Sequence, residues 1–486
     1  MTRFLYGAAV QGIQGFILQT NKLKEIAGAS ELVENICTRL FAEQLGKSWE
    51  ALSSDPDAIL NAAGNIKYIF TDEKVCRKVF LEFPQKVMEA APGITISQAV
   101  VNFDGDFAKA VDALEKKLRI QRNLPAQPLT YGQMGVQRSR TTGLPAVTLE
   151  QGEFLDKASL NKREAAESHA LFDKAVEPEL GKLFRKPYDI EQMTGRNDWI
   201  AIIHADGNSL GQVVRQIGNQ PEKFKKFSAK LDEATASAAK NAVSQVIRSS
   251  MGKVFPMRPV VLGGDDLTVI IRGDLALDFT KAYLVEFEAQ TKKLLGGIDK
   301  SLSEGLTACA GIAYIKSSFP YYYGYSLAED LCSAAKKDSK ARDKVRSCLM
   351  FHKVQDSFVL SYEDIIRREL VADKDLTFQF GPYYLEGDTP EGKWSVEELG
   401  SKVNSLDSDE GNVVKSGIRQ WLSLVLDGHK NGAGKQKIDR MKSISGAGQK
   451  KLIDDLTADI YGGKSVSAVP AYDVLSLHSV TFQETK

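Results

Sequence analysis

The chain has 486 residues, which is enough for about three domains of ordinary size. Its 63 Lys and Arg residues equal its 63 Asp and Glu residues, a balance that argues against a strong free-standing nucleic-acid binder. No apolar run reaches membrane-spanning length and the N-terminus lacks a signal-peptide pattern, so no membrane association is expected. The five cysteines are scattered without a CxxC pair, which predicts reduced, buried thiols in a cytoplasmic protein and no zinc ribbon.

Residues 1–118 are predicted to form a first α+β domain. Its expected elements, in chain order, are a strand at Phe4–Val10, a helix that ends near Leu45, a hairpin at Asn61–Phe70, a helix at Glu73–Ala90, a strand at Gly93–Asn102 and a helix at Phe107–Leu118. Ser30 is a plausible N-cap for the helix that ends near Leu45.

Residues 119–195 have a different character. They begin with a stretch rich in Gly, Pro, Ser and Thr and continue into a charged, helix-prone segment at Leu160–Phe184. This composition predicts a connector with little core of its own.

Residues 196–355 repeat the first pattern of elements. They are predicted to contain a strand at Trp199–His204, a long Ala-rich helix from about Lys223 to Ser250, a hairpin at Val260–Ile271, a helix at Leu277–Leu295, a strand at Leu306–Ile315 and a helix at Tyr325–Lys337. The order strand-helix-strand-strand-helix-strand is the split ferredoxin-like arrangement.

The hairpin of this second domain carries two adjacent acids. Gly263 and Gly264 permit the positive φ angles of a tight turn, and Asp265 and Asp266 follow them directly. Neighbouring carboxylates repel one another, so such a pair is tolerated mainly where a cation neutralises it. An ordinary Asp-rich turn is the simpler interpretation of these four residues taken alone.

A third acid is expected to join this pair. Asp206 ends the first strand of the domain, which lies beside the hairpin in this topology, so Asp206, Asp265 and Asp266 should converge. Three carboxylates at neighbouring strand ends suit one or two Mg²⁺ or Mn²⁺ ions. Such ions bridge triphosphate oxygens and activate an attacking ribose hydroxyl, so the three acids are the predicted catalytic and metal-binding residues.

Residues around these acids are candidates for binding a nucleotide. Gly207 lets the backbone approach phosphates, and Asn208 and Ser209 continue the turn into a helix whose N-terminal amides suit an anion. Gly263 and Gly264 of the hairpin turn are further candidates for binding the nucleotide. Lys336 or Lys337 on the last helix is within predicted reach of the same phosphates, although a Lys pair at a helix end often simply faces solvent.

The two α+β domains are predicted to be copies of one fold. The segments that begin at Gly93 and Gly305 line up with each other, and so do the two hairpins. At the acidic positions of the second copy the first copy is neutral, with Gln11 for Asp206, Asn65 for Asp265 and Ile66 for Asp266. Only the second copy is therefore expected to bind metal.

Residues 356–486 are predicted to form a mostly helical third domain. Apolar periodicity marks Asp364–Val371 and Ile418–Leu426, and two similar glycine turns, which begin at Gly432 and Gly446, flank a basic helix. Both turns are interpreted as solvated loops, because they lack the strand context of a phosphate-binding loop. The predicted fold is thus α+β, with two ferredoxin-like palm domains, the first degenerate, and a helical C-terminal domain.

At this point the sequence resembles a known family, the large polymerase-like (GGDD palm) subunit of type III CRISPR effector complexes. The resemblance covers roughly residues 1–355 and rests on the GGDD hairpin, the preceding segment from Ala205 to Gly211, the opening segment from Gly7 to Glu34 and the duplication. It implies a cytoplasmic nucleotidyltransferase that joins ATP into cyclic oligoadenylates when target RNA is bound, in antiviral defence. It also implies partners, namely ATP and the other subunits of such a complex with guide and target RNA.

Three departures from the family are visible. This chain starts directly at the first palm, where the family commonly carries an HD nuclease domain, so it looks like a variant without that domain. The region between the palms has no cysteine where the family often has a zinc site, and Asn208 replaces a frequent second acid. Two other functions remain open: a nucleotide-binding scaffold subunit without turnover, and a free-standing defence polymerase that acts without guide RNA.

Overall fold

The computed structural model describes residues 3–62, 64–103, 106–124, 135–194, 198–217, 220–356, 361–373, 376–462 and 466–481. Part of the predicted connector, residues 125–134, lies outside this description. Within these ranges no helix combines the length and the apolarity that a membrane crossing requires.

The chain divides into two compact units, and each unit is assembled from segments that are separate in the sequence. One unit comprises Met1–Gln192, Ser209–Val269 and Glu286–Leu306, and the other comprises Met193–Asn208, Ile270–Val285 and Thr307–Lys486. The division into four domains in chain order, at residues 1–118, 119–195, 196–355 and 356–486, stays a prediction.

The first copy of the repeated fold is built on a four-stranded antiparallel sheet with the order β2-β3-β1-β4. Its strands are β1 Arg3–Gln11, β2 Ala58–Ala62, β3 Asn65–Phe70 and β4 Thr95–Phe103. In the register, Ala9 lies opposite both Asn65 on β3 and Ser97 on β4. β1 is buried from Leu5 to Val10, which explains its continuous run of apolar residues.

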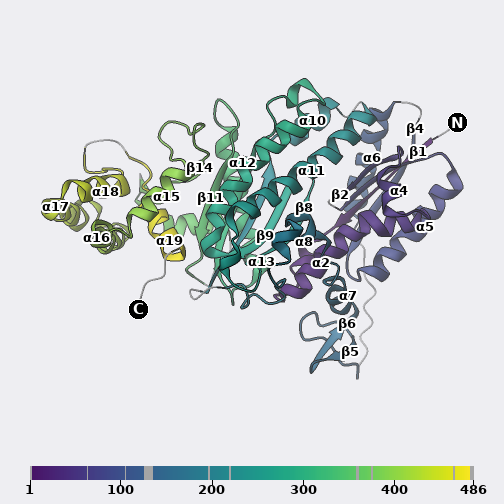
Figure 1. Cartoon of the computed structure of the whole chain (residues 1–486), viewed down its shortest axis with the longest axis horizontal. Coiled ribbons are helices and arrows are strands. Elements are labelled where there is room, and N and C mark those ends of the chain that lie inside the picture. The colour runs from purple at the N-terminus through teal and green to yellow at the C-terminus, as the bar shows by residue number, and fades with distance from the viewer. Residues whose placement is uncertain are drawn as a thin grey trace. The chain divides into compact units, whose positions relative to one another are not determined.

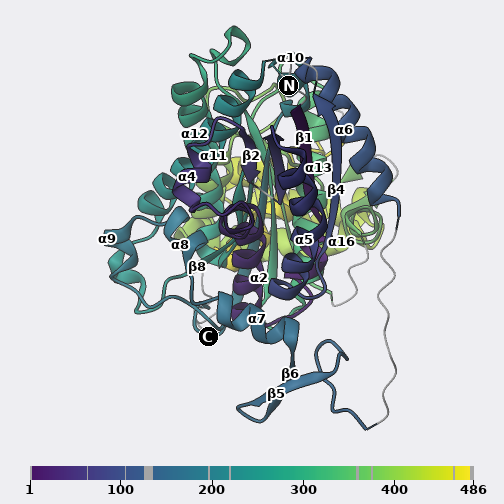
Figure 2. The ribbon, with the colours of Figure 1, turned by 90° about the vertical axis from the view of Figure 1, so that its right-hand side faces the viewer.

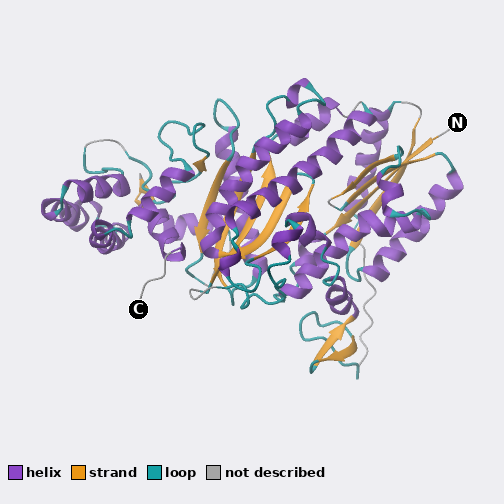
Figure 3. Cartoon of the chain, in the orientation of Figure 1, coloured by secondary structure: helices purple, strands orange, loops and turns teal. Residues whose placement is uncertain are grey.

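Helices cover both faces of this sheet (Figure 3). The helical elements of this copy are α1 Ile13–Ile17, α2 Leu23–Asn35, a π-helical turn Ile36–Leu40, α3 Phe41–Gln44, α4 Trp49–Ser53, α5 Glu73–Ala90 and α6 Phe107–Arg122. Successive residues of a strand point to opposite faces. Tyr6 bonds to Gln98, which in turn donates to the backbone of α5, whereas Gly7 lies against Leu114 of α6. Hence α5 and α6 pack on opposite faces.

The predicted helix cap at Ser30 is wrong. α2 begins at Leu23 with Lys22 in the N-cap position, so Ser30 lies in the middle of the helix. Its buried hydroxyl donates to the carbonyl of Ile26 at 3.0 Å, the usual way in which an interior serine satisfies its side chain. The helix therefore begins seven residues before the predicted cap, and the buried apolar residues between Leu23 and Ser30 are part of it.

The second copy has the same strand order and is extended by two strands. A six-stranded sheet has the order β14-β11-β10-β7-β9-β8, in which β8-β9-β7-β10 corresponds to β2-β3-β1-β4. The strands are β7 Trp199–Gly207, β8 Met257–Gly263, β9 Asp266–Arg272, β10 Ala308–Lys316, β11 Cys348–Lys353 and β14 Tyr383–Tyr384. The order of the strands supports the duplication that the sequence predicted.

The helices of the second copy lie close to their predicted positions. They are α10 Leu210–Ile217, α11 Pro221–Val246, α12 Ala276–Leu295 and α13 Tyr321–Lys340, together with short 3₁₀ turns at Ser249–Met251, Gly273–Leu275 and Lys300–Leu302. α13 connects β10 to the parallel strand β11 and packs on both. Gly311 makes this close approach possible, because a Cβ there would lie 2.0 Å from the carbonyl oxygen of Ala328.

The connector after α6 docks on α2 (Figure 2). It consists of β5 Ala146–Glu150, β6 Glu153–Asp156, α7 Lys157–Ala165, α8 Ala170–Ala175 and α9 Pro178–Gly181. Arg163 bonds to the buried carboxylate of Glu25 at 2.7 Å and to Glu153 at 2.6 Å. Buried Phe172 and Phe184 pack edge-on against Phe255. These contacts stabilise a connector that has no cysteine.

The C-terminal segment is mostly helical, as predicted (Figure 1). Its elements are α14 Tyr362–Ile365, a π-helical turn Ile366–Leu370, β12 Val371–Asp373, β13 Leu376–Thr377, α15 Val396–Ser405, α16 Asp409–Leu426, a π-helical turn Lys430–Gly434, α17 Lys435–Ile444, α18 Ala447–Thr457 and α19 Ala471–Thr481. The two glycine turns flank the basic helix α17. Trp421 of α16 is fully buried and anchors this helical core.

Candidate metal and nucleotide site

Asp206 is presented by a rigid strand. β7 is buried along most of its length and pairs antiparallel with β10, with Asp206 opposite Cys309. The neighbours Ala205 and Gly207 are buried, whereas Asp206 is half-buried. Because Asp206 lies at the end of a rigid strand, its carboxylate loses little conformational entropy when it binds a ligand.

The GGDD turn joins β8 to β9. Gly264 has a φ of 63°, a left-handed conformation that favours glycine and that the sequence predicted for this turn. Its N–H donates to Asp232 at 3.2 Å, and its carbonyl accepts from the Thr235 hydroxyl at 2.6 Å. Both partners lie on α11, so this helix fixes the peptide that precedes Asp265.

The structure brings the three predicted acids together. Asp206, Asp265 and Asp266 each offer a carboxylate oxygen, and these three atoms lie within 4.8 Å of one another. All three side chains are half-buried, so they face solvent only in part. Hard oxygen donors at this spacing fit one or two Mg²⁺ or Mn²⁺ ions, because ligands of one ion lie up to about 4 Å apart and two metals in such sites are about 3.5–4 Å apart.

Lys336 reaches this cluster from α13. Its ammonium pairs with the Asp206 carboxylate and donates to the Gly207 carbonyl at 3.0 Å. Lys337 is the next residue of the same helix and is exposed. Of the two candidate lysines, Lys336 is therefore the one positioned to neutralise Asp206 or an anion beside it.

The turn after Asp206 is hydrogen-bonded to Cys309 of β10 and to Thr307, the residue just before β10. The buried amide of Asn208 donates to the Thr307 hydroxyl at 2.9 Å and to the Cys309 sulfur at 3.4 Å, and its N–H donates to the Thr307 carbonyl. Ser209 has a φ of 62° and precedes α10. Gly207 is buried below the turn. The roles of these residues in binding a nucleotide stay predictions.

One group that holds the GGDD turn was not foreseen from the sequence. Lys174 of α8 donates to the Leu262 carbonyl at 3.0 Å, pairs with Asp232 at 2.9 Å and lies 3.7 Å from Glu34 of α2. Burial favours the neutral amine, but Glu34 and Asp232 outweigh it and raise the pKa of Lys174, whereas burial raises the pKa of Glu34. We name Lys174, Asp232 and Glu34 the turn clamp. Lys174 looks like any other charged residue of a connector, so no local pattern marks it.

His204 is the nearest histidine to the acids along the chain. Burial lowers its pKa, and Lys336 adds to this effect while Asp206 opposes it. Its ring packs edge-on against Tyr325 of α13 at 5.7 Å. The ring of His204 therefore helps to pack β7 against α13.

The corresponding turns of the first copy are neutral, as predicted. Gly12 and Gly64 have φ angles of 64° and 76°, so the backbone turns are preserved. Gln11 uses its amide to bond to the Ala9 carbonyl, and Ile66 is buried. The first copy therefore has no carboxylate at the positions that correspond to the three acids.

A carboxylate triad at the end of a duplicated ferredoxin-like sheet defines a palm domain of the polymerase and nucleotide-cyclase type. Residues 199–346 match the family described as Cas10/Cmr2, second palm domain. This segment is thus similar to the second palm of Cas10/Cmr2 proteins, in agreement with the resemblance drawn from the sequence. No curated protein matches the chain.

Solved structures with a similar fold include Csm1–Csm4 cassettes. The complex with pppApApA has a TM-score of 0.58 at 14% identity and covers 99% of this chain and 69% of the matched chain. The complex with cA4 has a TM-score of 0.56 at 14% identity, covering 99% and 70%. The complex with one ATP has a TM-score of 0.55 at 13% identity, covering 99% and 69%. The α+β architecture with two palms and a helical C-terminal segment is therefore confirmed.

Proposed function

We propose that this protein is a metal-dependent nucleotidyltransferase that joins ATP into cyclic oligonucleotide messengers in CRISPR-type antiviral defence. The observation that carries the proposal is the convergence of Asp206, Asp265 and Asp266 within 4.8 Å at the edge of a Cas10/Cmr2-type palm. Structures of the same fold in complex with ATP, with pppApApA and with cA4 support the choice of nucleotide.

The three acids are the residues that would hold Mg²⁺ or Mn²⁺. Such an ion, when bound, neutralises triphosphate charge and lowers the pKa of an attacking ribose hydroxyl. Lys336 would exchange its contact with Asp206 for a phosphate oxygen once the carboxylate is neutralised. The α11 side chains Asp232 and Thr235 keep the GGDD turn fixed, so the acids need not reorganise when substrate binds.

The protein is also proposed to work beside other subunits. The similar structures are complexes of Csm1 with Csm4, and one of them comes from a type III-A CRISPR-Csm interference complex. A Csm4-like subunit with guide and target RNA is therefore the proposed partner of this chain. The same similarity favours a subunit over a free-standing polymerase.

The test is synthesis of messenger from labelled ATP by the purified chain and by its assembled complex, each with Mg²⁺ and with Mn²⁺. Wild type is expected to form oligonucleotides, and Asp265→Asn with Asp266→Asn is expected to lose at least 100-fold in rate while remaining folded. A matched control is Asp274→Asn, an acid on the 3₁₀ turn after β9 that pairs with Arg272. If ATP is bound by wild type but never converted under any of these conditions, the scaffold function replaces the enzymatic one.

A further inference from the structure

The two copies of the fold differ at one edge of their sheets. In the second copy, β10 pairs with β7 on one side and with the parallel strand β11 on the other. In the first copy, the corresponding strand β4 pairs with β1 and is the last strand of its sheet in the described part of the chain. The outer edge of β4 is therefore the position that β11 fills in the second copy.

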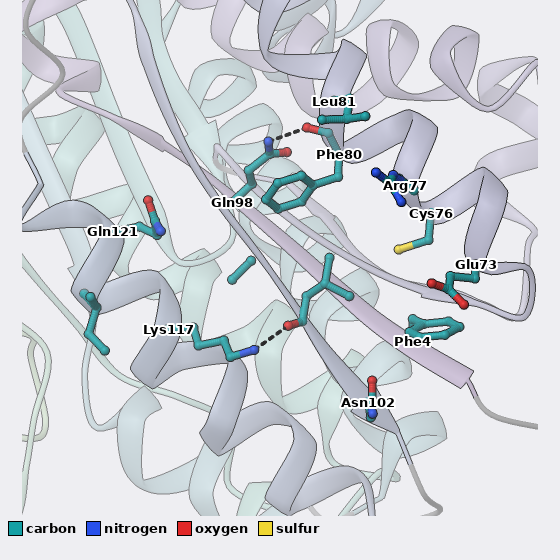
Figure 4. Close-up of a pocket in the computed structure, with 13 residues that line it drawn as sticks. Phe4, Glu73, Cys76, Arg77, Phe80, Leu81, Gln98, Asn102, Lys117 and Gln121 are labelled. Atoms are coloured by element: carbon teal, nitrogen blue, oxygen red, sulfur yellow. Dashed lines mark hydrogen bonds between the residues drawn. The ribbon is translucent and has the colours of Figure 1, made fainter.

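A groove runs along this open edge (Figure 4). Its volume is about 550 Å³, and its floor is formed by β4 residues Gln98, Ala99, Val100 and Asn102. Its two walls come from the helices on opposite faces of the sheet, α5 and α6. A cavity of this size between two helices at a strand edge has room for an extended peptide.

Backbone groups of β4 point into the groove. In an antiparallel pair, alternate residues direct both backbone groups away from the partner strand. Lys117 of α6 donates to the Val100 carbonyl at 2.9 Å, which places Val100, and with it Gln98 and Asn102, in the outward set. An exposed row of this kind is a template for pairing with another strand unless it is covered.

Both walls of the groove carry large apolar side chains that are exposed to solvent. Leu81 of α5 is 66% exposed and Ile120 of α6 is 62% exposed, and both line the groove. The charged lining groups are Arg77, Lys117 and Glu73, which give one net positive charge. A strand of alternating apolar residues with an acidic group at its end would match this lining. The strand that fills the corresponding place in the second copy is itself apolar, CLMFHK, and is buried from Cys348 to His352.

We propose that the β4 edge of the first palm is a docking site for an extended segment of a partner subunit, which adds to the sheet as a fifth strand. This inference rests on the proposed function, because it places the partner within an effector assembly. The main-chain bonds to β4 would give affinity and the apolar walls would give specificity. The second copy supplies its fifth strand from its own chain, through α13 and the loop that follows it.

The experiment compares amide hydrogen exchange of β4 in the purified full chain and in its assembled effector complex. Exchange at Gln98, Val100 and Asn102 is expected to slow at least tenfold in the complex. Leu81→Glu combined with Ile120→Glu is expected to reduce the complex recovered at least tenfold. Met88→Glu, at a 63% exposed position of α5 outside the groove, is the matched control and should leave assembly unchanged.

Three outcomes of the exchange measurement overturn the proposal. Equal exchange of β4 in both samples, or protection confined to α5 and α6, shows that no strand is added. Protection that rises with the concentration of the chain alone assigns the edge to a second copy of the protein. Messenger synthesis is measured in the same samples, so a chain that makes messenger with an unprotected β4 refutes only the docking site. A protected β4 in a complex that makes no messenger refutes only the enzymatic function.

Discussion

Replacement of Lys174 by methionine tests how the GGDD turn is held. The substitution keeps the apolar stem but leaves Glu34 and Asp232 without their shared cation and removes the donor to the Leu262 carbonyl. Removing one partner of a fully buried ion pair costs about 3–5 kcal/mol. The Lys174 side chain is 22% exposed, so solvent screening reduces the expected loss in the free energy of unfolding to roughly 2 kcal/mol.

The effect on the reaction is expected to exceed the effect on binding. A displacement of about 1 Å at a catalytic group can cost on the order of 100-fold in rate. We expect kcat of messenger synthesis to fall roughly 10- to 100-fold, with less than a threefold change in KM for ATP, because the clamp contacts the turn and not the substrate. Lys174→Arg should recover much of the rate, since it keeps the charge.

The assay combines steady-state kinetics with chemical denaturation at matched temperature. Lys182→Met is the control, because this lysine lies on the same connector and is 69% exposed in a pair with Glu179. A Lys174→Met protein that loses stability but keeps wild-type kcat would show that the clamp is only structural and would refute this reasoning. An unchanged stability would refute the assigned contacts.

Three further predictions concern other parts of the chain. Lys336→Met should raise KM for ATP about tenfold. Titration calorimetry should show that Mn²⁺ binds the variant at least as tightly as wild type, because the substitution removes a cation beside Asp206. Weaker Mn²⁺ binding would contradict the placement of Lys336 beside the metal site. Gly28→Ala should lower Tm by several degrees, because its Cβ would lie 1.5 Å from the Lys162 carbonyl oxygen, whereas Gly15→Ala has open space and should not. Burial lowers the pKa of His352 to about 4. The stability that depends on the neutral ring is therefore complete above pH 6.5, and the free energy of unfolding falls by at most about 3 kcal/mol as the pH falls from 6.5 to 4. Denaturation curves of His352→Gln should lack this loss.

Sequence patterns were sufficient for the acids and for the core strands of the two palm sheets, whereas the connector hairpin β5–β6 and the added strands β11 and β14 were not predicted. Asp206 and the GGDD residues follow apolar strands, and the pairing of those strands determines where the acids meet, so the cluster could be predicted without coordinates. The helix α5 was predicted with its observed bounds, Glu73–Ala90, because its apolar period and its Asp72 cap agree. Local signals and tertiary structure point the same way in these segments.

Features that depend on distant parts of the chain could not be predicted. Ser30 was taken for a cap because serine favours that position, but packing of α2 against α7, α8 and β8 stabilises a helix that begins earlier. Lys174 reaches Leu262 across 88 residues of sequence, and its partners come from two other helices. The open edge of β4 becomes visible only when the two sheets are compared, because the sequence shows strands but not which strand lacks a neighbour.

The most direct test of the central claim is to locate Mn²⁺ by its anomalous scattering in crystals of the full chain grown with a non-hydrolysable ATP analogue. One or two peaks are expected about 2.1–2.3 Å from carboxylate oxygens of Asp206, Asp265 and Asp266, with the triphosphate on the same ions. A nucleotide bound elsewhere, or Mn²⁺ absent from these three carboxylates at saturating concentration, would contradict it.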